Sequence, residues 1–510
     1  MIMIQETLKS LELQNIYGQL NQLLEEVEGF GSGMVSADLI ERHVLKGVLE
    51  MGKKLLSYSI KIRHEELEED GLPEKKSAKN KGLLYRPYGS IFGDIEVLCR
   101  KYHLPEKGSY YPLWDSLQLP AIKYSYVLQD WLGQNSTELD YRESVGMLNE
   151  ILGLNLNGTQ SKSQSNFLGS QVKAYYEAKT AVAVETDSYI CVEWDGKGVP
   201  LIKPLDSKDV EEPTSRSSVV GRLKRGEKRG VKKTATVSVV SDFVPKKRTK
   251  DSIIRGLFKS PLTVLERAEK EKKSALEIVH TKRAKWHENI HRRAFMCGQQ
   301  KSIDYGVLLA KDRIQNSPSK NIGIVALVDG GIGLENNIVA AFERENMSHQ
   351  LEHIILDIVH VSEYVWKAGN AILGEKSSLR TNWVKGVLTD LLDGKVGQVI
   401  EELKRNYDKT TLSDSPKKLL QKTITYFTNH QHKMDYKTYL EKGLPVSTAL
   451  VESSCGHLVK DRMERSGMRW SLQGAQNMMD VRAVKKNGDW TDFMEFVQHQ
   501  NYMKNAAKVA

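Results

Sequence analysis

The length, composition and charge of this chain exclude several classes of protein. With 510 residues, of which 40% are hydrophobic, it can bury a sizeable core, and the length suggests two to four domains. Its four cysteines are far apart and form no Cys-x-x-Cys pair, which argues against a disulfide framework or a cysteine zinc site. Apolar runs such as 322–328 are shorter than the roughly 20 residues that span a bilayer, and no signal-peptide pattern begins the chain. We therefore expect a protein of the reducing cytoplasm, neither membrane-bound nor secreted.

The positive charge is modest overall but locally concentrated. A total of 74 Lys and Arg against 65 Asp and Glu gives a net charge of +9. Much of the excess lies between Arg216 and Lys259, and this segment includes Lys232 and Lys233. Such a density favours contact with a polyanion such as DNA, although a solvated basic loop would have the same composition.

The N-terminal region is predicted to be mainly helical. In 1–80, apolar residues recur at helical spacing and are followed by a charged linker, which indicates a packing or assembly segment. Aromatic and β-branched residues in 81–120 predict a small β element. The pattern becomes helical again in 121–184, with a helix stop at Gly153.

A polar run at 159–168 follows this helix stop. As the second helix of a helix-turn-helix, it would present Gln160, Lys162, Gln164 and Asn166 to bases and phosphates. An ordinary polar helical hairpin explains the same pattern equally well. We therefore predict a DNA-binding region here and keep the hairpin as the alternative.

Residues 185–364 are predicted to form an α/β core. The apolar run 189–194 ends at Asp195-Gly196, and the β-branched run 322–328 ends at Asp329-Gly330, so both indicate buried strands that deliver a carboxylate at their ends. Period-two alternation predicts a further strand over 234–240, and 354–359 another. The segment 261–313 is predicted to be helical. Strands that alternate with helices imply a mixed α/β sheet with covered faces.

The last third of the chain is predicted to be helical. Leucine, valine and isoleucine recur at helical spacing in 365–440, which we interpret as an all-α insertion within the α/β domain. The segment 441–510 is expected to supply the final helices of the core.

Three carboxylates stand where a metal site could form. Two Mg²⁺ ions held by a few carboxylates can activate an attacking oxygen and stabilise a leaving oxygen in phosphodiester chemistry. Asp195 and Asp329 each follow a predicted strand, although an Asp-Gly turn is the plainer interpretation of either one alone. Glu452 begins a predicted helix, where an acid is favoured in any case.

Several motifs together resemble one family. They are GLPVS at 443–447, VES at 451–453, VKDRM at 459–463, SGMRWS at 466–471, DGKGVP at 195–200, DIVHVSEYVW at 357–366, EKRGVKK at 227–233, FGDI at 92–95 and YSY at 124–126. In these motifs the chain resembles bacterial insertion-sequence transposases of the Kra type, over about residues 85–495. That family is similar to the wider DDE superfamily, which includes Mutator-like and hAT elements.

The resemblance implies a fold and a set of catalytic residues. It implies a ribonuclease-H-like mixed sheet interrupted by an all-α insertion before the last acid, with an N-terminal, mainly helical DNA-binding region. Asp195, Asp329 and Glu452 would be the three catalytic acids and the ligands of two Mg²⁺ ions, for which Mn²⁺ can substitute. Asp357 remains a rival for the second acid, because it too ends a predicted strand.

The resemblance also implies DNA contacts around these acids. Asp357 and His360 occupy the place of a Cys-x-x-His pair in relatives and would orient DNA near the scissile phosphate, although His360 is equally a candidate core histidine. Arg462 and Arg469 could grip phosphates and Trp470 could stack on an unpaired base, or Trp470 could cap the core instead. Relatives with a zinc ribbon carry Cys-x-x-Cys where this chain has LPEKG at 104–108, so no zinc is expected.

The function expected from this resemblance is DNA transposition. The protein would cleave at the ends of its own insertion sequence and join them to target DNA, acting in the bacterial cytoplasm and on the nucleoid when bound. Because two ends are processed together, a homodimer or larger assembly is expected. A structure-specific nuclease on the same core and a catalytically silent DNA-binding protein remain as alternatives.

Overall fold

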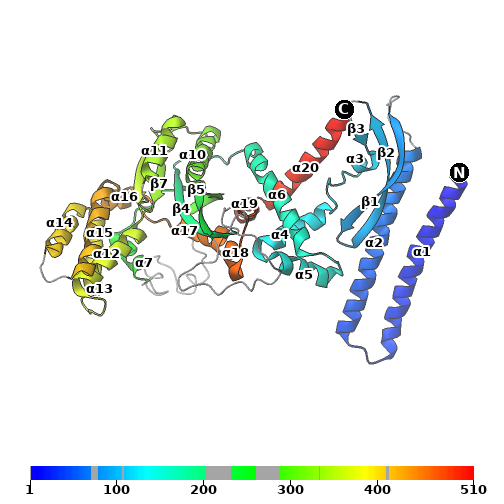
Figure 1. Cartoon of the computed structure of the whole chain (residues 1–510), viewed down its shortest axis with the longest axis horizontal. Helices are drawn as coiled ribbons and strands as arrows, with labels where there is room; N and C mark the ends of the chain where they lie inside the picture. The colour runs from blue at the N-terminus through cyan, green and yellow to red at the C-terminus, as the bar shows by residue number, and fades with distance from the viewer. Residues whose placement is uncertain are drawn as a thin grey trace, which may run out of the picture. The chain divides into compact units, whose positions relative to one another are not determined.

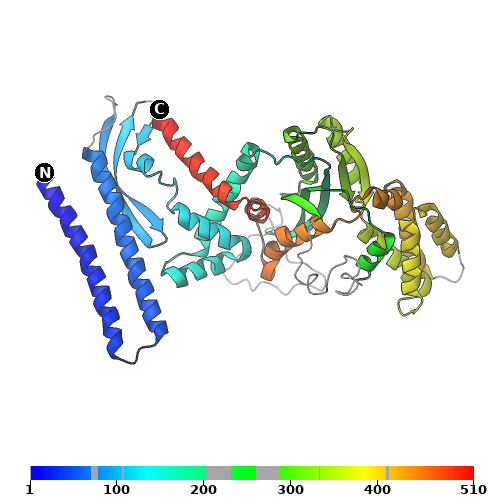
Figure 2. The same cartoon turned by 180° about the vertical axis from the view of Figure 1, so that it is seen from behind.

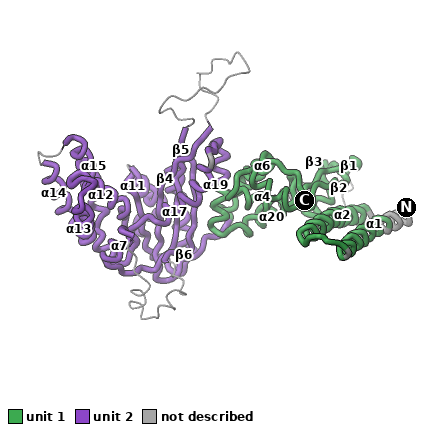
Figure 3. The backbone as a smooth tube through the Cα atoms, turned by 90° about the horizontal axis from the view of Figure 1, so that it is seen from below, with its two compact units in different colours: residues 1–178, 480–510 green, residues 179–479 purple. Residues whose placement is uncertain are grey.

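The computed structural model divides the chain into two compact units. Unit 1 comprises Met1–Ala178 and Asp480–Ala510, and unit 2 comprises Lys179–Met479 (Figure 3). The residues described are 2–69, 78–105, 108–202, 231–259, 286–331, 333–408 and 413–509. The predicted final segment of the core, 441–510, is therefore divided between the two units. No described helix is long and apolar enough to cross a membrane.

Unit 1 begins with a long helical hairpin beside a small sheet. Its elements are α1 (Ile2–Gly29), a short 3₁₀ turn (Phe30–Ser32), α2 (Ala37–Glu69), β1 (Lys79–Ser90), β2 (Gly93–Leu104), β3 (Gly108–Tyr110) and α3 (Pro112–Ser116). The three strands are antiparallel in the order β1-β2-β3. Ile60 of α2 packs with Val97 and Cys99 of β2, and α1 contacts α2 (Figure 1). The predicted helical segment and β element are thus present.

The rest of unit 1 is a helical bundle. It consists of α4 (Tyr126–Glu138), α5 (Tyr141–Leu152), α6 (Gly158–Ala178) and α20 (Trp490–Val509). A capping box starts α5, because Asp140 accepts from the backbone of Glu143 while the Glu143 side chain accepts from the backbone of Asp140. Gly153, at φ 64°, ends it in the left-handed conformation that glycine adopts at low cost. Leu168 and Val172 of α6 pack with Phe493 of α20.

Unit 2 is built on a mixed sheet of five strands. These are β4 (Tyr189–Leu201), β5 (Val231–Phe243), β6 (His287–Met296), β7 (Ile324–Val328) and β8 (Leu351–Leu356), in the order β6-β5-β4-β7-β8. The strand β5 is antiparallel to both β4 and β6, whereas β7 is parallel to β4 and β8 is parallel to β7. Unit 2 is therefore α/β, as predicted.

One prediction for this sheet is wrong. The segment 261–313 was expected to be helical, but β6 occupies His287–Met296 and only α10 (Gln299–Asn316) is a helix within the described part; residues 261–285 lie outside the described residues. The sequence HENIHRRAFM has no strand periodicity of its own. Its conformation follows from pairing with β5, a tertiary effect that overrides local preference.

Helices cover both faces of the sheet. The helices α10 and α11 (Leu334–Arg344) lie on one side, and α17 (Ala449–Ser454) with the π-helical turn Cys455–Lys460 on the other (Figures 1 and 2). Side chains alternate along β4 accordingly. Trp194 faces α10 and donates from its indole to the Ser302 carbonyl at 3.1 Å, while Glu193 accepts from the Val451 backbone of α17.

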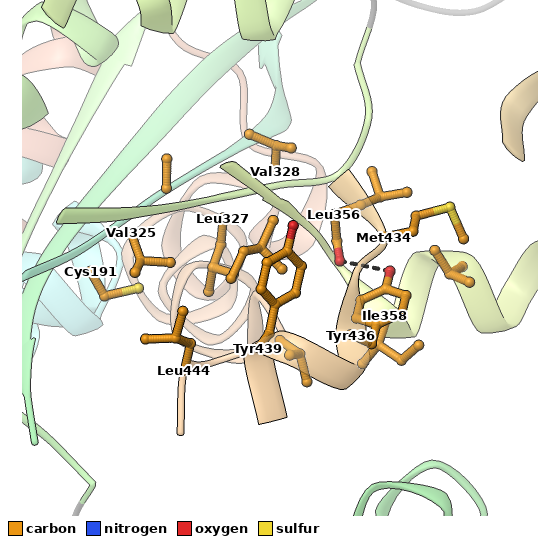
Figure 4. Close-up of a cluster of buried hydrophobic side chains, with 14 of the residues drawn as sticks. Cys191, Val325, Leu327, Val328, Leu356, Ile358, Met434, Tyr436, Tyr439 and Leu444 are labelled. Carbon is orange, nitrogen blue, oxygen red and sulfur yellow. Dashed lines mark hydrogen bonds between the residues drawn. The ribbon is translucent and has the colours of Figure 1, made fainter. Parts of the chain in front are cut away.

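A run of helices separates β8 from α17. It contains α12 (Ile358–Leu373), α13 (Arg380–Leu392), α14 (Val396–Tyr407), α15 (Asp414–His430), the 3₁₀ turn Gln431–Lys433 and α16 (Tyr436–Lys442), and α13 also contacts α7 (Lys250–Leu257). Figure 4 shows how this run joins the sheet: Tyr436, Met434 and Leu444 pack against Leu327 and Leu356, and the buried Tyr436 hydroxyl donates to the Leu356 carbonyl at 2.9 Å. The described part of 365–440 is helical, as predicted.

Short helices complete unit 2 after α17. They are α18 (Asp461–Met463), the 3₁₀ turn Arg465–Gly467 and α19 (Leu472–Asn487), which continues into unit 1. The backbone of Trp470 pairs with Leu201 at the end of β4. This pairing ties the C-terminal motif region to the central strand.

The close approach of α10 to the sheet at Gly306 gives a first test. A Cβ at this position would lie 2.8 Å from the Ser238 hydroxyl and 3.0 Å from a Val192 methyl. We expect Gly306→Ala to destabilise unit 2 by about 1–3 kcal/mol through overpacking. Gly386→Ala is the control, because this helical glycine of α13 has nothing within 4 Å, and alanine there should stabilise by about 0.5–1 kcal/mol.

Scanning calorimetry of the full chain measures both changes. Equal and small shifts in the two variants would show that α10 does not pack this closely on β4 and β5.

Candidate active site

Three aspartates lie where the parallel strands of the unit 2 sheet stop pairing, at their carboxyl ends. The parallel pairing of β4 with β7 ends at Glu193 and Leu327, so Asp195 and Asp329 both stand two residues further on. The pairing of β7 with β8 ends at Val328 and Leu356, and the next residues are Asp329 and Asp357. The carboxyl ends of parallel strands form the edge at which α/β proteins place their ligands.

Asp195 does not end its strand, contrary to the prediction. The strand β4 continues to Leu201, because β5 remains paired with it from Asp195–Val237 to Leu201–Val231. The plain Asp-Gly turn is excluded for the same reason. The side chain of Asp195 is half-buried, and its Oδ1 accepts from the Gly196 backbone at 2.6 Å.

Asp329 occupies a turn that an aromatic side chain holds in place. Its half-buried carboxylate accepts from the Gly331 backbone at 2.9 Å. Its carbonyl accepts from the Tyr426 hydroxyl at 2.8 Å, and the Tyr426 ring stacks on Tyr364 with 3.9 Å between centroids. Gly330 has a φ of 85° and approaches Tyr426 so closely that a Cβ would lie 2.7 Å from the hydroxyl. The turn therefore requires glycine at this position.

Asp357 is completely buried and fully hydrogen-bonded. Its carboxylate accepts from the backbone of Val359 and of His360 as the N-cap of α12, from the His360 imidazole at 2.9 Å, and from the Thr448 backbone at 3.2 Å. These donors use about all the lone-pair positions that a carboxylate offers. Asp357 therefore connects β8, α12 and the segment that leads into α17.

His360 lies between Asp357 and Glu452. Its Nδ1 is 2.9 Å from Asp357 Oδ2 and 4.0 Å from Glu452 Oε1. The hydrogen bond with Asp357 raises the pKa of His360 to about 9, against the opposing effect of burial. The imidazole is therefore positively charged at neutral pH. Because the His360 side chain is one-third exposed, it is not a core histidine.

Glu452 completes the cluster from α17, on the face of the sheet opposite α10. Its side chain is 41% exposed on α17. Partial burial raises its pKa, and the charges of Asp357 and Asp195 raise it further. Among the described residues, Asp357, His360 and Glu452 form the group whose potential ligand atoms lie within 4.8 Å of one another. Asp195 and Asp329 are outside this group but act electrostatically on Glu452 and His360 respectively.

A fifth acid, beneath the site, is absent from the sequence predictions. Glu193 is 1% exposed, and its Oε2 accepts from the Val451 backbone at 3.0 Å. Burial raises its pKa to about 8, and the charges of Asp357 and Glu452 act in the same direction. An acid inside an apolar strand, on the face that also carries Asp195, is the signal that could have identified it.

The basic residues near the C-terminal motif fall into exposed and buried groups. Of the basic segment 216–259, the structure describes 231–259. Lys232 and Lys233 are exposed at the start of β5, and Lys232 pairs with Glu464 at 2.7 Å. Exposed Arg469 lines a cavity of about 320 Å³ together with Lys232 and Glu464. These three cations are available to a polyanion.

Arg462 and Trp470 are not available in this way. Arg462 is 0% exposed and its guanidinium lies 4.9 Å from the centre of the Trp470 ring. Trp470 is 6% exposed, and its indole donates to the Met463 carbonyl at 3.0 Å. The expectation of direct DNA contact by these two residues is corrected accordingly: both pack inside unit 2, which is the structural alternative for Trp470.

The predicted DNA-reading residues belong to α6 in unit 1. Gln160 accepts through its side chain from the Asn157 backbone and so caps the start of the helix, and Lys162 is exposed. Gln164 is 2% exposed and donates to Gln129 at 3.1 Å. The expectation that Gln164 reads DNA is wrong, because its side chain bonds α6 to α4.

Two comparisons with known proteins found no match. A scan against protein-family models found no family that matches this chain, and a search of curated proteins found no match. A proposal for function therefore rests on the chemistry of the site. Its partly exposed acids come from β4, β7 and α17, and the buried acids Glu193 and Asp357 bond the segments around them.

The buried carboxyl of Glu193 gives a second test, in metal-free protein. Its pKa is about 8 in the folded chain and 4.5 in its ordinary state, so between these values the unfolded chain loses a proton that the folded chain keeps. The stability of the wild type should thus fall, relative to Glu193→Gln, as the pH rises from 4.5 to 8. The relative change should be on the order of 2–4 kcal/mol, since each pKa unit is worth about 1.4 kcal/mol.

Urea unfolding of both proteins at several pH values in this window measures the difference. Glu363→Gln, at an exposed acid of α12, serves as the control. A stability difference that stays constant with pH would mean that Glu193 ionises normally in the fold.

Proposed function

We propose that this chain is a DNA transposase of the DDE type, which cleaves at the ends of an insertion sequence and joins them to target DNA. The observation that carries the proposal is the convergence of Asp195, Asp329 and Glu452 on one edge of the sheet, from β4, β7 and α17. The function is the one that the motif resemblance implies. The geometry supports it independently of the motifs.

The architecture of unit 2 supports a ribonuclease-H-like fold. The first strand of the unit, β4, is central in a mixed sheet and carries the first acid. Helices α12 to α16 then separate β8 from Glu452, as a helical insertion before the last acid requires. The second acid at the end of the neighbouring parallel strand fits the same plan.

The burial pattern favours Asp329 over Asp357 as the second acid. Asp357 is fully buried, and its lone pairs are taken by Val359, His360 and Thr448. Asp329 is half-exposed, with its carboxylate bonded to the Gly331 backbone. A ligand must keep oxygen lone pairs for the ion, so Asp357 is better suited to positioning than to ligation.

The donor set fits a hard divalent cation. Asp195, Asp329 and Glu452 offer only carboxylate oxygens, the ligands that Mg²⁺ prefers, and a cation would offset the burial and the repulsion that together raise the pKa of Glu452. These three residues would hold two Mg²⁺ ions, with Mn²⁺ as a substitute. When bound, the ions activate the attacking oxygen and stabilise the leaving oxygen.

Other residues of the chain bind and orient DNA in this proposal. Protonated His360, held by Asp357, places a positive charge beside the acids and can contact a phosphate near them. Lys233 pairs with Val199, four residues beyond Asp195 on β4, which places it roughly 13 Å along the strand. With Lys232 and Arg469 it forms an exposed basic end suited to the DNA backbone.

Cleavage and joining of DNA test the proposal directly. The substrates are linear fragments that contain the genomic sequences flanking the gene on both sides, with Mg²⁺. Asp195→Asn, Asp329→Asn and Glu452→Gln should each lower both steps at least about 100-fold, because the metal contributes several kcal/mol to the transition state. Asp357→Asn should retain some activity, since asparagine is also a good N-cap.

The other outcomes are equally informative. Activity in Asp329→Asn with none in Asp357→Asn would move the second acid to Asp357. Cleavage without joining of pre-cleaved ends would indicate a nuclease, and DNA binding without cleavage would indicate a silent binding protein. Glu363→Gln, a nearby exposed acid, should behave like the wild type.

Mn²⁺ binding distinguishes two arrangements of ligands. If the ion lies at the proposed acids, Asp195→Asn should weaken Mn²⁺ binding at least about 10-fold, and His360→Gln should change it little. Electron paramagnetic resonance titration of free Mn²⁺ measures both. A loss in His360→Gln as large as in Asp195→Asn would place the ion on the Asp357, His360 and Glu452 group instead.

A further inference from the structure

The turn at Asp329 is bonded to the end of α15. The Asp329 carbonyl accepts from the hydroxyl of Tyr426, which lies near the end of this helix, 97 residues further along the chain. The carboxylate of Asp329 accepts from the Gly331 backbone, within the turn itself. The position of this carboxylate relative to the sheet therefore depends on where the turn is held, and Tyr426 is a side chain that holds it.

The ring of Tyr426 has a fixed place between two helices. It stacks on Tyr364 of α12 with 3.9 Å between centroids and 9° between planes, and the edge of His430 meets it at 4.8 Å. The Thr423 hydroxyl, one turn earlier on α15, donates to the Tyr364 carbonyl at 3.4 Å. Because packing on α12 fixes the ring, its hydroxyl is a well-placed donor to the turn.

The far end of the segment after Asp329 is held by the same part of the chain. Glu335, in the first turn of α11, lies 2.8 Å from the His432 imidazole and pairs with the Lys433 ammonium. Lys433 is only 3% exposed, and a buried cation is costly without its partner. Residues 426–433 thus contact both the beginning and the end of the segment.

The segment itself contributes little to its own conformation. Between Asp329 and Glu335 it contains three glycines, Gly330, Gly331 and Gly333, of which the first and third have a φ of 85° and 75°. Glycine restricts the backbone least of all residues. Contacts at the two ends therefore decide where this segment lies.

We propose that Tyr426 is a positioning residue for Asp329, so that the end of α15 determines how well the site binds a divalent cation. The inference rests on the proposed function for the assignment of Asp329 as a metal ligand. It gives the helical run a role at the site, although none of its residues from α13 to α16 is a proposed ligand. Asp195 needs no such support, because the pairing of β4 with β5 fixes its backbone.

The affinity of the full chain for Mn²⁺, measured by electron paramagnetic resonance, tests the role of the hydroxyl. Tyr426→Phe keeps the ring and removes the donor, and it should weaken Mn²⁺ binding about 10-fold, as the loss of a residue that orients a ligand typically does. Tyr364→Phe is the matched control. It removes the hydroxyl of the other ring in the same stack, which has no hydrogen-bond partner among the described residues, and it should bind like the wild type.

Lys433→Met tests the other end of the segment. Removing a positive charge from the protein should by itself strengthen the attraction of a cation. We expect the opposite, Mn²⁺ binding that is several-fold weaker, because the contact with Glu335 is lost. Lys404→Met is the control, since it removes the same charge from an exposed ion pair with Glu401 on α14, 2.8 Å apart. It should bind at least as tightly as the wild type.

Thermal unfolding of the same variants separates positioning from a structural role. A Tyr426→Phe protein that is less stable but binds Mn²⁺ like the wild type, while Asp329→Asn binds it weakly, would overturn the inference and leave the proposed site intact. Wild-type affinity in Asp329→Asn would overturn both, because Asp329 would not be a ligand. The expected Mn²⁺ affinities together with no cleavage of DNA would support the inference and count against transposition alone.

Discussion

The geometry of the candidate site depends on the buried carboxylate of Asp357. This one group ends β8, caps α12, holds the His360 imidazole and accepts from the Thr448 backbone just before α17. The neighbouring Ile358 backbone donates to Val446 at 2.9 Å and reinforces the same junction. Helices α13 to α16 lie between these segments in the sequence. The position of Glu452 relative to the sheet therefore rests on a contact that spans the whole helical run.

The site is a balance of like charges under partial burial. Burial raises the pKa of Glu193 and of Glu452, and the charge of Asp357 raises the pKa of both further. The hydrogen bond with Asp357 raises the pKa of His360 as well, so His360 gains a proton while the buried Glu193 keeps its own. A divalent cation bound here would offset the same negative charges. The arrangement is unfavourable without such a partner, which is typical of functional sites.

The sequence predicted the strands that carry the acids better than the strand at the edge. The apolar runs before Asp195 and Asp329 reflect burial on both faces, so their pattern was local and readable. The edge strand β6 is mostly polar because one side of it faces no further strand among the described residues, and its conformation comes from β5. Glu193 escaped prediction for a related reason. Its buried carboxyl accepts a hydrogen bond from the Val451 backbone, 258 residues away in the sequence.

A sequence motif also does not show whether a given side chain is buried or exposed. Arg462 and Arg469 belong to one motif region, yet Arg462 is buried beside Trp470 whereas Arg469 is exposed. Asp329 and Asp357 both follow a parallel strand, but only Asp357 begins a helix at once, and the free backbone donors of that helix occupy its carboxylate. An acid that caps a helix is held in place and satisfied, whereas an acid before a glycine turn keeps lone pairs free. The local backbone that follows each strand thus separates a positioning acid from a candidate ligand.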